Sequence, residues 1–362
     1  MRYGELVRKQ AKSGFLSRVP HLEAEANRWL ENWPLRTRDV LRRRVSSSNT
    51  DDVYPALLEL YVHEMLRHRF LGVCYEPTLP NTPNHPEFLA RDGRESIIVE
   101  CKVVFDEECI RVSNREITRL VNVVNTIQSD YGISIQPEGR LRRAIIPRRI
   151  GAFLRRELPR LPRPIQLGTS LVFSDPPTGT RVTFELLGPN DPGANPVWTW
   201  WPSGERAEEV TTHERILSAV DEKATKYGEL AEPFLVVIWP LTEFPPISPV
   251  ILRALYGDDQ LQINPLTRSV VGRTRSANGA FTRVSKEGAA LCSRVSAVGI
   301  YHLHLDSQDT HEHRFAIFHN PHAGHVLNPS LFDRVPHFAV QTHNDQVTTL
   351  GWRDGARPHW WD

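Results

Sequence analysis

Cysteine, lysine and long apolar runs are all scarce in this chain of 362 residues. Its four cysteines form no CxxC pair and are too few for a disulfide-stapled scaffold, so we expect reduced thiols. No apolar run approaches the ~20 residues that cross a bilayer, and the opening residues, MRYGELVRKQAKSGF, lack the apolar region of a signal peptide. These absences predict a cytoplasmic protein without a membrane partner.

A net charge of one sign is also lacking, because 44 basic residues stand against 43 acidic ones. Whole-chain charge therefore gives no argument for nucleic acid, and only local clusters can supply one. Lysine accounts for six of the basic residues and arginine for 38, which makes the place of each lysine informative. With 40% hydrophobic residues, the chain can bury a core, and its length predicts about two domains.

The spacing of apolar residues predicts an α/β arrangement of helices and strands in the first half of the chain. Residues 1–45 are basic and helical in pattern, and the polar stretch 46–50 precedes a helix over about 52–70. The run SIIVECKVV over 96–104 is typical of a central strand buried on both faces. Further strands are expected at 72–76, 86–91 and 132–136, and a further helix at 112–129, which gives the order αβββαβ.

Composition changes again after this region. Residues 137–165 are rich in arginine, and residues 166–362 have the mixed pattern of an α+β region. A helix over about 212–227 carries the apolar stripe Ile216, Val220, Ala224 and Tyr227, and FLVVIW at 234–239 is typical of a buried strand. We therefore expect a basic N-terminal segment (1–45), an α/β core (46–136), an arginine-rich connection (137–165) and a C-terminal region (166–362).

Three charged residues stand out in this pattern. The two-residue period of a strand places Glu100 and Lys102 on one face and Cys101 on the other. A two-residue turn at Asp92-Gly93 pairs Glu87 with residue 98, and a four-residue turn pairs it with Glu100; both put Glu87 on the Glu100 face. A three-residue turn puts it on the other face unless a bulge corrects the register.

Two neighbouring carboxylates repel each other, and a hard divalent cation relieves the repulsion. Mg²⁺ or Mn²⁺ held by Glu87 and Glu100 would suit phosphodiester hydrolysis, with Lys102 orienting water or neutralising the transition state. The alternative is a structural ion pair on a solvated sheet face. The apolar run around Lys102 favours function, because burying an unpaired lysine is costly.

Pro86-Glu87, twelve intervening residues and Glu100-Cys101-Lys102, set in the order αβββαβ, resemble the PD-(D/E)xK nuclease superfamily of restriction enzymes and Holliday-junction resolvases. The resemblance covers about residues 50–136, and Glu87 replaces the usual aspartate. It implies a restriction-endonuclease-like core, a mixed sheet flanked by helices, and metal-dependent endonuclease activity. Double-stranded DNA is the implied substrate, in restriction, phage defence or repair, and a homodimer is implied where both strands are cut.

The resemblance also implies a further glutamate ligand from the first helix, for which the chain offers Glu59 and Glu64. Glu64 lies on the apolar face and Glu59 near the polar side, so both stay candidates. The competing function is a catalytically degraded nuclease fold that binds nucleic acid or serves assembly. Loss of metal-dependent cutting in a Lys102→Ala variant would favour the enzyme.

Two other clusters allow two interpretations each. The arginine-rich segment can contact phosphates or form the solvated face of an amphipathic helix; its candidates are Arg140, Arg142, Arg143, Arg148, Arg149, Arg155 and Arg156. Nine histidines lie between 302 and 343 and either hold zinc, which would make this half a zinc enzyme, or make polar loop and phosphate contacts.

Overall fold

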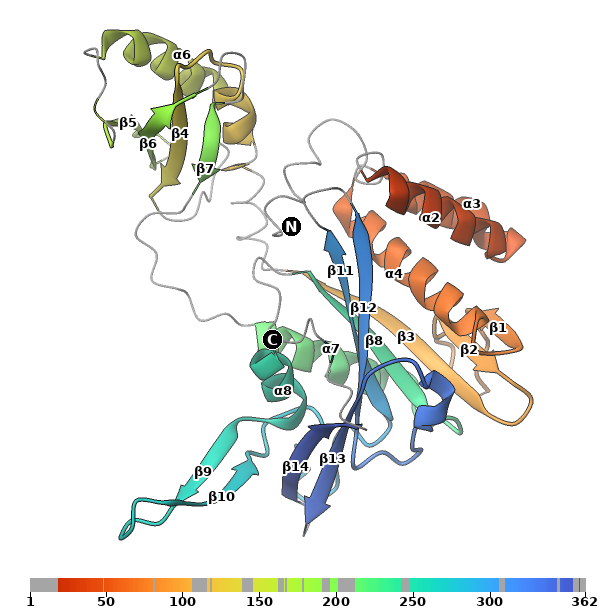
Figure 1. Cartoon of the computed structure of the whole chain (residues 1–362). Coiled ribbons are helices and arrows are strands. Elements are labelled where there is room, and N and C mark those ends of the chain that lie inside the picture. Colours follow the sequence, from red (N-terminus) through yellow and green to blue (C-terminus); the bar gives the residue numbers. More distant parts are fainter. Residues whose placement is uncertain are drawn as a thin grey trace. The chain divides into compact units, whose positions relative to one another are not determined.

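The computed structural model divides the chain into two compact units. The first contains residues 1–3, 12–105 and 211–362, and the second contains residues 4–11 and 106–210 (Figure 1). The structure describes residues 19–47, 49–80, 82–105, 116–117, 119–138, 146–161, 166, 168–177, 179–190, 196–200, 212–241, 248–305, 310–343, 346–353 and 358.

An eight-stranded mixed sheet forms the centre of the first unit, in the order β1-β2-β3-β8-β11-β12-β13-β14. Strands β1 to β3 are antiparallel, and β8 then runs parallel to both β3 and β11. The strands are β1 (Gly72–Tyr75), β2 (Phe88–Arg91), β3 (Ser96–Phe105), β8 (Phe234–Leu241), β11 (Ala297–Leu305), β12 (His311–His319), β13 (His337–His343) and β14 (Gln346–Trp352). A separate hairpin is formed by β9 (Asp259–Ile263) and β10 (Val270–Arg275).

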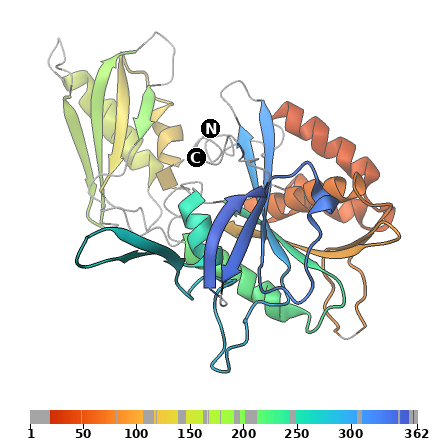
Figure 2. The ribbon, with the colours of Figure 1, turned by 60° about the horizontal axis from the view of Figure 1, so that its bottom comes forward.

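Helices cover both faces of this sheet. Figures 1 and 2 show α2 (Pro20–Asn32), α3 (Leu35–Val45) and α4 (Thr50–Arg67) on one face and α7 (Thr212–Lys226) with α8 (Ser248–Tyr256) on the other. On the α4 side, Tyr54 packs edge-on against Trp239 of β8, with ring centroids 5.3 Å apart. On the α7 side, Ile216 shares a buried cluster with Ile98 of β3. The short helix η3 (Pro329–Phe332) precedes β13.

Local sequence signals account for these elements. Asn49 caps α4 because its side-chain oxygen accepts the N–H of Asp51 at 3.2 Å. Strand β3 is apolar along most of its length because it lies between β2 and β8 with helices on both faces. The four stripe residues predicted for α7 are all buried, and β8 is buried throughout. The helices predicted at 52–70 and 212–227 and the strands predicted at 72–76, 86–91, 96–104 and 234–239 are therefore confirmed, whereas residues 1–18 of the predicted helical segment 1–45 lie outside the described residues.

The second unit has its own four-stranded sheet and core. The sheet order is β5-β6-β4-β7, and Ile150 and Leu154 of the helix α6 pack into a buried cluster with Ile135 and Phe184. The elements are β4 (Tyr131–Pro137), α6 (Pro147–Glu157), η2 (Leu158–Arg160), β5 (Ser170–Asp175), β6 (Thr180–Pro189) and β7 (Val197–Trp200). Of the helix predicted at 112–129, residues 116–117 and 119–124 are described and helical.

The αβββαβ order is present, but its last two elements are not the predicted ones. The strand expected at 132–136 is β4, which pairs with β6 and β7 in the second unit. The strand that pairs with β3 on its other side is β8, which is preceded by α7. The division of the chain therefore differs from the expected segments 46–136, 137–165 and 166–362: residues 106–210 form an insertion between β3 and α7.

None of the helices in the described ranges is long and apolar enough to cross a membrane.

Candidate active site

The hairpin of β2 and β3 brings Glu87 and Glu100 together. Arg91 pairs with Ser96, so the turn has four residues and its register sets Glu87 opposite Glu100. Two of the expected registers place Glu87 on the Glu100 face, and the structure has the one with the four-residue turn. Asp92 stabilises the turn, because its Oδ1 accepts the N–H groups of residues 94 and 95 at 3.0 and 2.8 Å.

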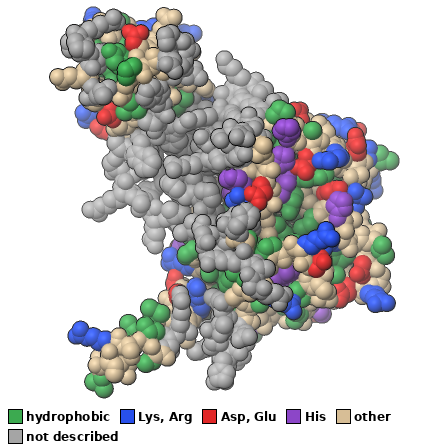
Figure 3. All heavy atoms as spheres, in the orientation of Figure 1, with side chains coloured by type: hydrophobic (Ala, Val, Ile, Leu, Met, Phe, Trp, Pro, Cys, Tyr) green, Lys and Arg blue, Asp and Glu red, His purple; other side chains and the backbone are tan. Residues whose placement is uncertain are grey.

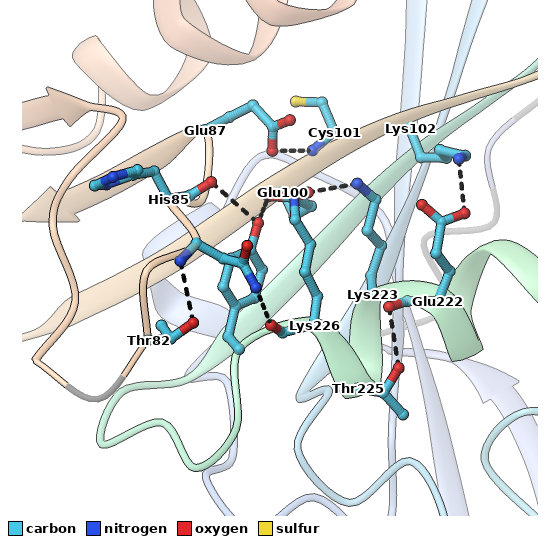
Figure 4. Close-up of polar contacts among 12 residues, drawn as sticks. Thr82, His85, Glu87, Glu100, Cys101, Lys102, Glu222, Lys223, Thr225 and Lys226 are labelled. Atoms are coloured by element: carbon cyan, nitrogen blue, oxygen red, sulfur yellow. Dashed lines mark hydrogen bonds and ion pairs between the residues drawn. The ribbon is translucent and has the colours of Figure 1, made fainter.

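Glu87 lies just before β2 and is anchored to the neighbouring strand. Its Oε2 accepts the backbone N–H of Cys101 at 3.0 Å (Figure 4). The loop that leads to it is tied to the end of α7, because the Asn84 side chain donates to the carbonyl of Lys226 at 2.8 Å. Glu87 as a whole residue is partly exposed, although its carboxyl group is largely buried.

Glu100 is fully buried and is held by two side chains at the end of α7 and by Tyr227, which directly follows the helix. Lys223 and Lys226 both donate to its Oε1, with Nζ–Oε1 distances of 2.5 and 2.7 Å. Tyr227 donates its hydroxyl proton to the other oxygen, Oε2. Figure 4 shows Lys223 and Lys226 reaching Glu100 from the α7 side. A buried carboxylate needs such partners, because an unpaired charge in the core is very costly.

Local helix geometry explains how two lysines reach a buried carboxylate. With about 100° of rotation per residue, Lys223 lies directly beside the apolar stripe of α7, whereas Lys226 lies about 80° from the nearest residue of the stripe. Their side chains are accordingly 8% and 32% exposed. The ammonium of Lys226 also lies over the ring of Tyr227, at 4.9 Å from the ring centroid. Lys223 is thus the buried partner of Glu100 and Lys226 the accessible one.

The two carboxyl groups titrate as a pair. Burial, followed by hydrogen bonding with Glu100 and the charge of Glu100, raises the pKa of Glu87 well above its usual value. Burial opposes ionisation of Glu100 too, but the interactions with Glu87, Lys223 and Lys226 lower the pKa of Glu100 below its usual value. The pair therefore keeps one proton at neutral pH, as carboxyl groups that share a site do.

Lys102 extends from the same face of β3 as Glu100, as the strand period predicted, but it has a different partner. Its Nζ lies 2.7 Å from Oε2 of Glu222 on α7. The Lys102 side chain is 34% exposed, and the hydrogen bond from Lys102 lowers the pKa of Glu222. Lys102 thus lies at the accessible edge of the site.

The structure places the two helix glutamates elsewhere. Glu59 is bound by both terminal nitrogens of Arg44, at 3.0 and 2.7 Å, and by the hydroxyl of Tyr75 at 3.4 Å. Glu64 interacts with Asn32, Arg67 and His68. Both project from α4, which packs on the sheet face opposite α7. Glu59 and Glu64 therefore do not join the Glu87–Glu100 pair.

The arginine candidates belong to the second unit. Arg148, Arg149, Arg155 and Arg156 are exposed on α6, whose other face is buried. Arg149 forms an ion pair with the buried carboxylate of Asp175 at 2.6 Å. Arg140, Arg142 and Arg143 lie outside the described residues. The amphipathic helix expected for this segment is therefore present, with its arginines available to solvent.

Three residues of this site were not predicted from the sequence: Lys223, Lys226 and Tyr227. The signal that could have found them is the scarcity of lysine: with Lys102, three of the chain's six lysines meet at this site. A helical projection of α7 also places Lys223 next to the apolar stripe, where a charged residue needs a buried partner.

Comparison of the chain with protein-family models, with curated proteins and with solved structures finds no match. The chemistry of this site must therefore be argued from its own residues.

Proposed function

We propose that this protein is a divalent-metal-dependent nuclease that hydrolyses phosphodiester bonds, with DNA as its substrate. The observation that carries the proposal is the Glu87–Glu100 pair, in which two carboxyl groups of the β2–β3 hairpin lie opposite each other and close enough for each to shift the pKa of the other. A proton in such a pair occupies the place that a cation can take. Two partly exposed lysines beside the site, Lys102 and Lys226, can face an anionic substrate.

The donor set fits Mg²⁺ or Mn²⁺, because both groups offer only carboxylate oxygens. Glu87 and Glu100 would hold the ion. When bound, such an ion supplies a water of lowered pKa and polarises the phosphoryl oxygen.

The remaining side chains have separate tasks. Lys223 and Tyr227 fix the orientation of the Glu100 carboxylate from both of its oxygens. Lys226 and Lys102, each about one third exposed, lie where they can contact a phosphate and neutralise the charge that develops on it. The sequence suggested this charge-neutralising role for Lys102, and we propose the same role for Lys226.

The fold supports this proposal. The order α4, β1, β2, β3, α7, β8, with three antiparallel strands and β8 parallel to β3, resembles the αβββαβ core of restriction-endonuclease-like proteins. The arginines on the exposed face of α6 are proposed contacts to the DNA backbone, which binds mainly through cations. A homodimer is proposed where both strands are cut.

One observation favours a second candidate function. With Glu87 protonated, the single negative charge of Glu100 is already outweighed by Lys223 and Lys226. A site with this charge balance also suits a protein that binds nucleic acid through the same fold without cutting it.

Incubation of plasmid DNA or structured RNA with Mg²⁺ or Mn²⁺ tests the proposal. Glu87→Gln preserves the hydrogen bond from the Cys101 N–H but removes a carboxylate, and Glu229→Gln makes the same change at an exposed position just after α7. We expect the wild type and Glu229→Gln to cut DNA, and Glu87→Gln to lose at least about 100-fold in rate, the upper end for residues that merely orient metal ligands.

Binding of DNA by the wild type without cleavage would favour the second candidate. Cleavage by Glu87→Gln at the wild-type rate would show that the carboxyl pair is not the active site. Cleavage of RNA alone would retain the mechanism and change the substrate.

A further inference from the structure

A second cluster of ionisable side chains lies on the other side of the sheet. His311 and His313 project from one face of β12, because residues two apart in a strand share a face. Both direct Nε2 at the same carboxylate oxygen, Oε2 of Glu25 on α2, at 2.5 and 2.9 Å. The sequence singled out the histidine-rich region but not Glu25, which lies 286 residues before His311.

The geometry of this cluster matches the requirements of a small divalent ion. One donor atom from each of Glu25, His311 and His313 lies within 4.8 Å of the other two. A tetrahedral zinc ion with bonds of about 2.0–2.1 Å keeps its donors about 3.3 Å apart, so small side-chain rotations suffice. Their side chains are 21%, 13% and 16% exposed, so water can complete the coordination.

The surroundings of His313 orient its ring as a metal ligand requires. Its Nδ1 lies 2.7 Å from the hydroxyl of Tyr301, a partner that leaves Nε2 directed at Glu25. The ring stacks on Tyr61 at a centroid distance of 5.0 Å and contacts Trp29 at 5.2 Å. Such packing holds the imidazole in one orientation before any ion arrives.

We propose that Glu25, His311 and His313 bind one zinc ion, with water in the fourth position, and that this ion clamps α2 to β12. Two imidazoles and one carboxylate are a donor set that zinc accepts and magnesium does not favour. Histidine side chains are visible next to acidic ones on the face drawn in Figure 3.

This site is distinct from the carboxyl pair. It lies on the sheet face covered by α2 and α4, and β8 and β11 separate β12 from β3 in the sheet. The inference therefore does not depend on the proposed nuclease function.

Titration of metal-free protein with Zn²⁺, in competition with a chromophoric chelator, tests the site. We expect one equivalent to bind to the wild type and to His21→Gln, a change at an exposed histidine of α2 itself. Glu25→Gln and His311→Ala should each lose at least about 100-fold in affinity, and Tyr301→Phe about 10–100-fold, the effect of losing a group that orients a ligand.

Circular dichroism of each variant shows whether it has folded, and the wild type provides a second readout. Zinc should raise the melting temperature of the wild type and leave that of Glu25→Gln unchanged. The proposal is overturned if the folded wild type binds no zinc, or if Glu25→Gln and His311→Ala bind it as tightly as the wild type does. The cluster would then be a hydrogen-bonded group without a metal.

Discussion

Lys223 and Lys226 provide a matched pair of perturbations, because both donate to the same oxygen of Glu100. Their exposures differ: the Lys223 side chain is 8% exposed, whereas that of Lys226 is 32% exposed. Lys223→Met removes the buried cation and leaves the charge of Glu100, which is fully buried, with the more exposed Lys226 and the hydroxyl of Tyr227. Breaking a buried ion pair costs about 3–5 kcal/mol, whereas partly exposed pairs contribute about 0–1 kcal/mol.

We therefore expect Lys223→Met to lower the free energy of unfolding by about 3 kcal/mol and Lys226→Met by less than about 1 kcal/mol. For a unit of this size, 1 kcal/mol moves the melting temperature by about 2–4 °C, so Lys223→Met should melt about 6–12 °C lower. Scanning calorimetry suits the measurement, because it can separate the transitions of the two units.

The double variant Lys223→Met/Glu100→Gln supplies the control. Removing both charges of a buried pair costs less than removing one, so the double variant should be more stable than Lys223→Met alone. Equal losses for Lys223→Met and Lys226→Met would refute the reasoning, as would a double variant that melts below Lys223→Met.

Two further predictions concern stability in the first unit. Burial lowers the pKa of His63 to about 4, so between pH 6.5 and 4 the unfolded chain binds a proton that the folded chain does not; stability should fall with falling pH across this window, by about 3 kcal/mol from this residue. Denaturant unfolding at about pH 4.5 and about pH 7.5 should show a smaller difference for His63→Leu than for the wild type, and an unchanged difference would contradict the assignment. Gly299→Ala places a Cβ 2.5 Å from the Phe315 ring in the middle of the sheet, so calorimetry should record a loss of about 1–3 kcal/mol; an unchanged melting temperature would mean that the ring moves aside freely.

Local patterns predicted the elements that depend on near neighbours. The run SIIVECKVV predicted β3, the apolar stripe from Ile216 to Tyr227 predicted α7, and FLVVIW predicted β8. Each prediction was possible because burial requires apolar residues at the buried positions of the segment. The turn after Asp92 limited the pairing of β2 with β3 to a few registers, and two of them placed Glu87 on the correct face. Half of the site was therefore accessible from the sequence.

The sequence did not show which strand pairs with β3 on its second side. The pattern predicted strands at both 132–136 and 234–239, and only the nearer one was assigned to the same core as β3. Residues 106–210 instead form a separate unit, and β8 comes from beyond it. Nothing in the apolar pattern of a strand identifies its partner.

Because of the same insertion, the α7 side of the site could not be predicted from the sequence. Lys223 lies 123 residues after Glu100, so their contact exists only once α7 has packed on β3. The alternation along β3 correctly placed Lys102 beside Glu100, but the partner of Lys102 is Glu222, on the same distant helix. Side-chain direction was predictable, whereas the partners that depend on long-range packing were not.

In the proposed function, Glu87 and Glu100 form a cation site that holds a proton when no ion is bound. Calorimetric titration with Mg²⁺ and with Mn²⁺ at neutral pH, repeated in two buffers of different ionisation enthalpy, measures binding and proton release together. The wild type should release about one proton per ion bound, and Glu87→Gln should bind much more weakly and release none. Binding without proton release, or equal binding by Glu87→Gln, would contradict it.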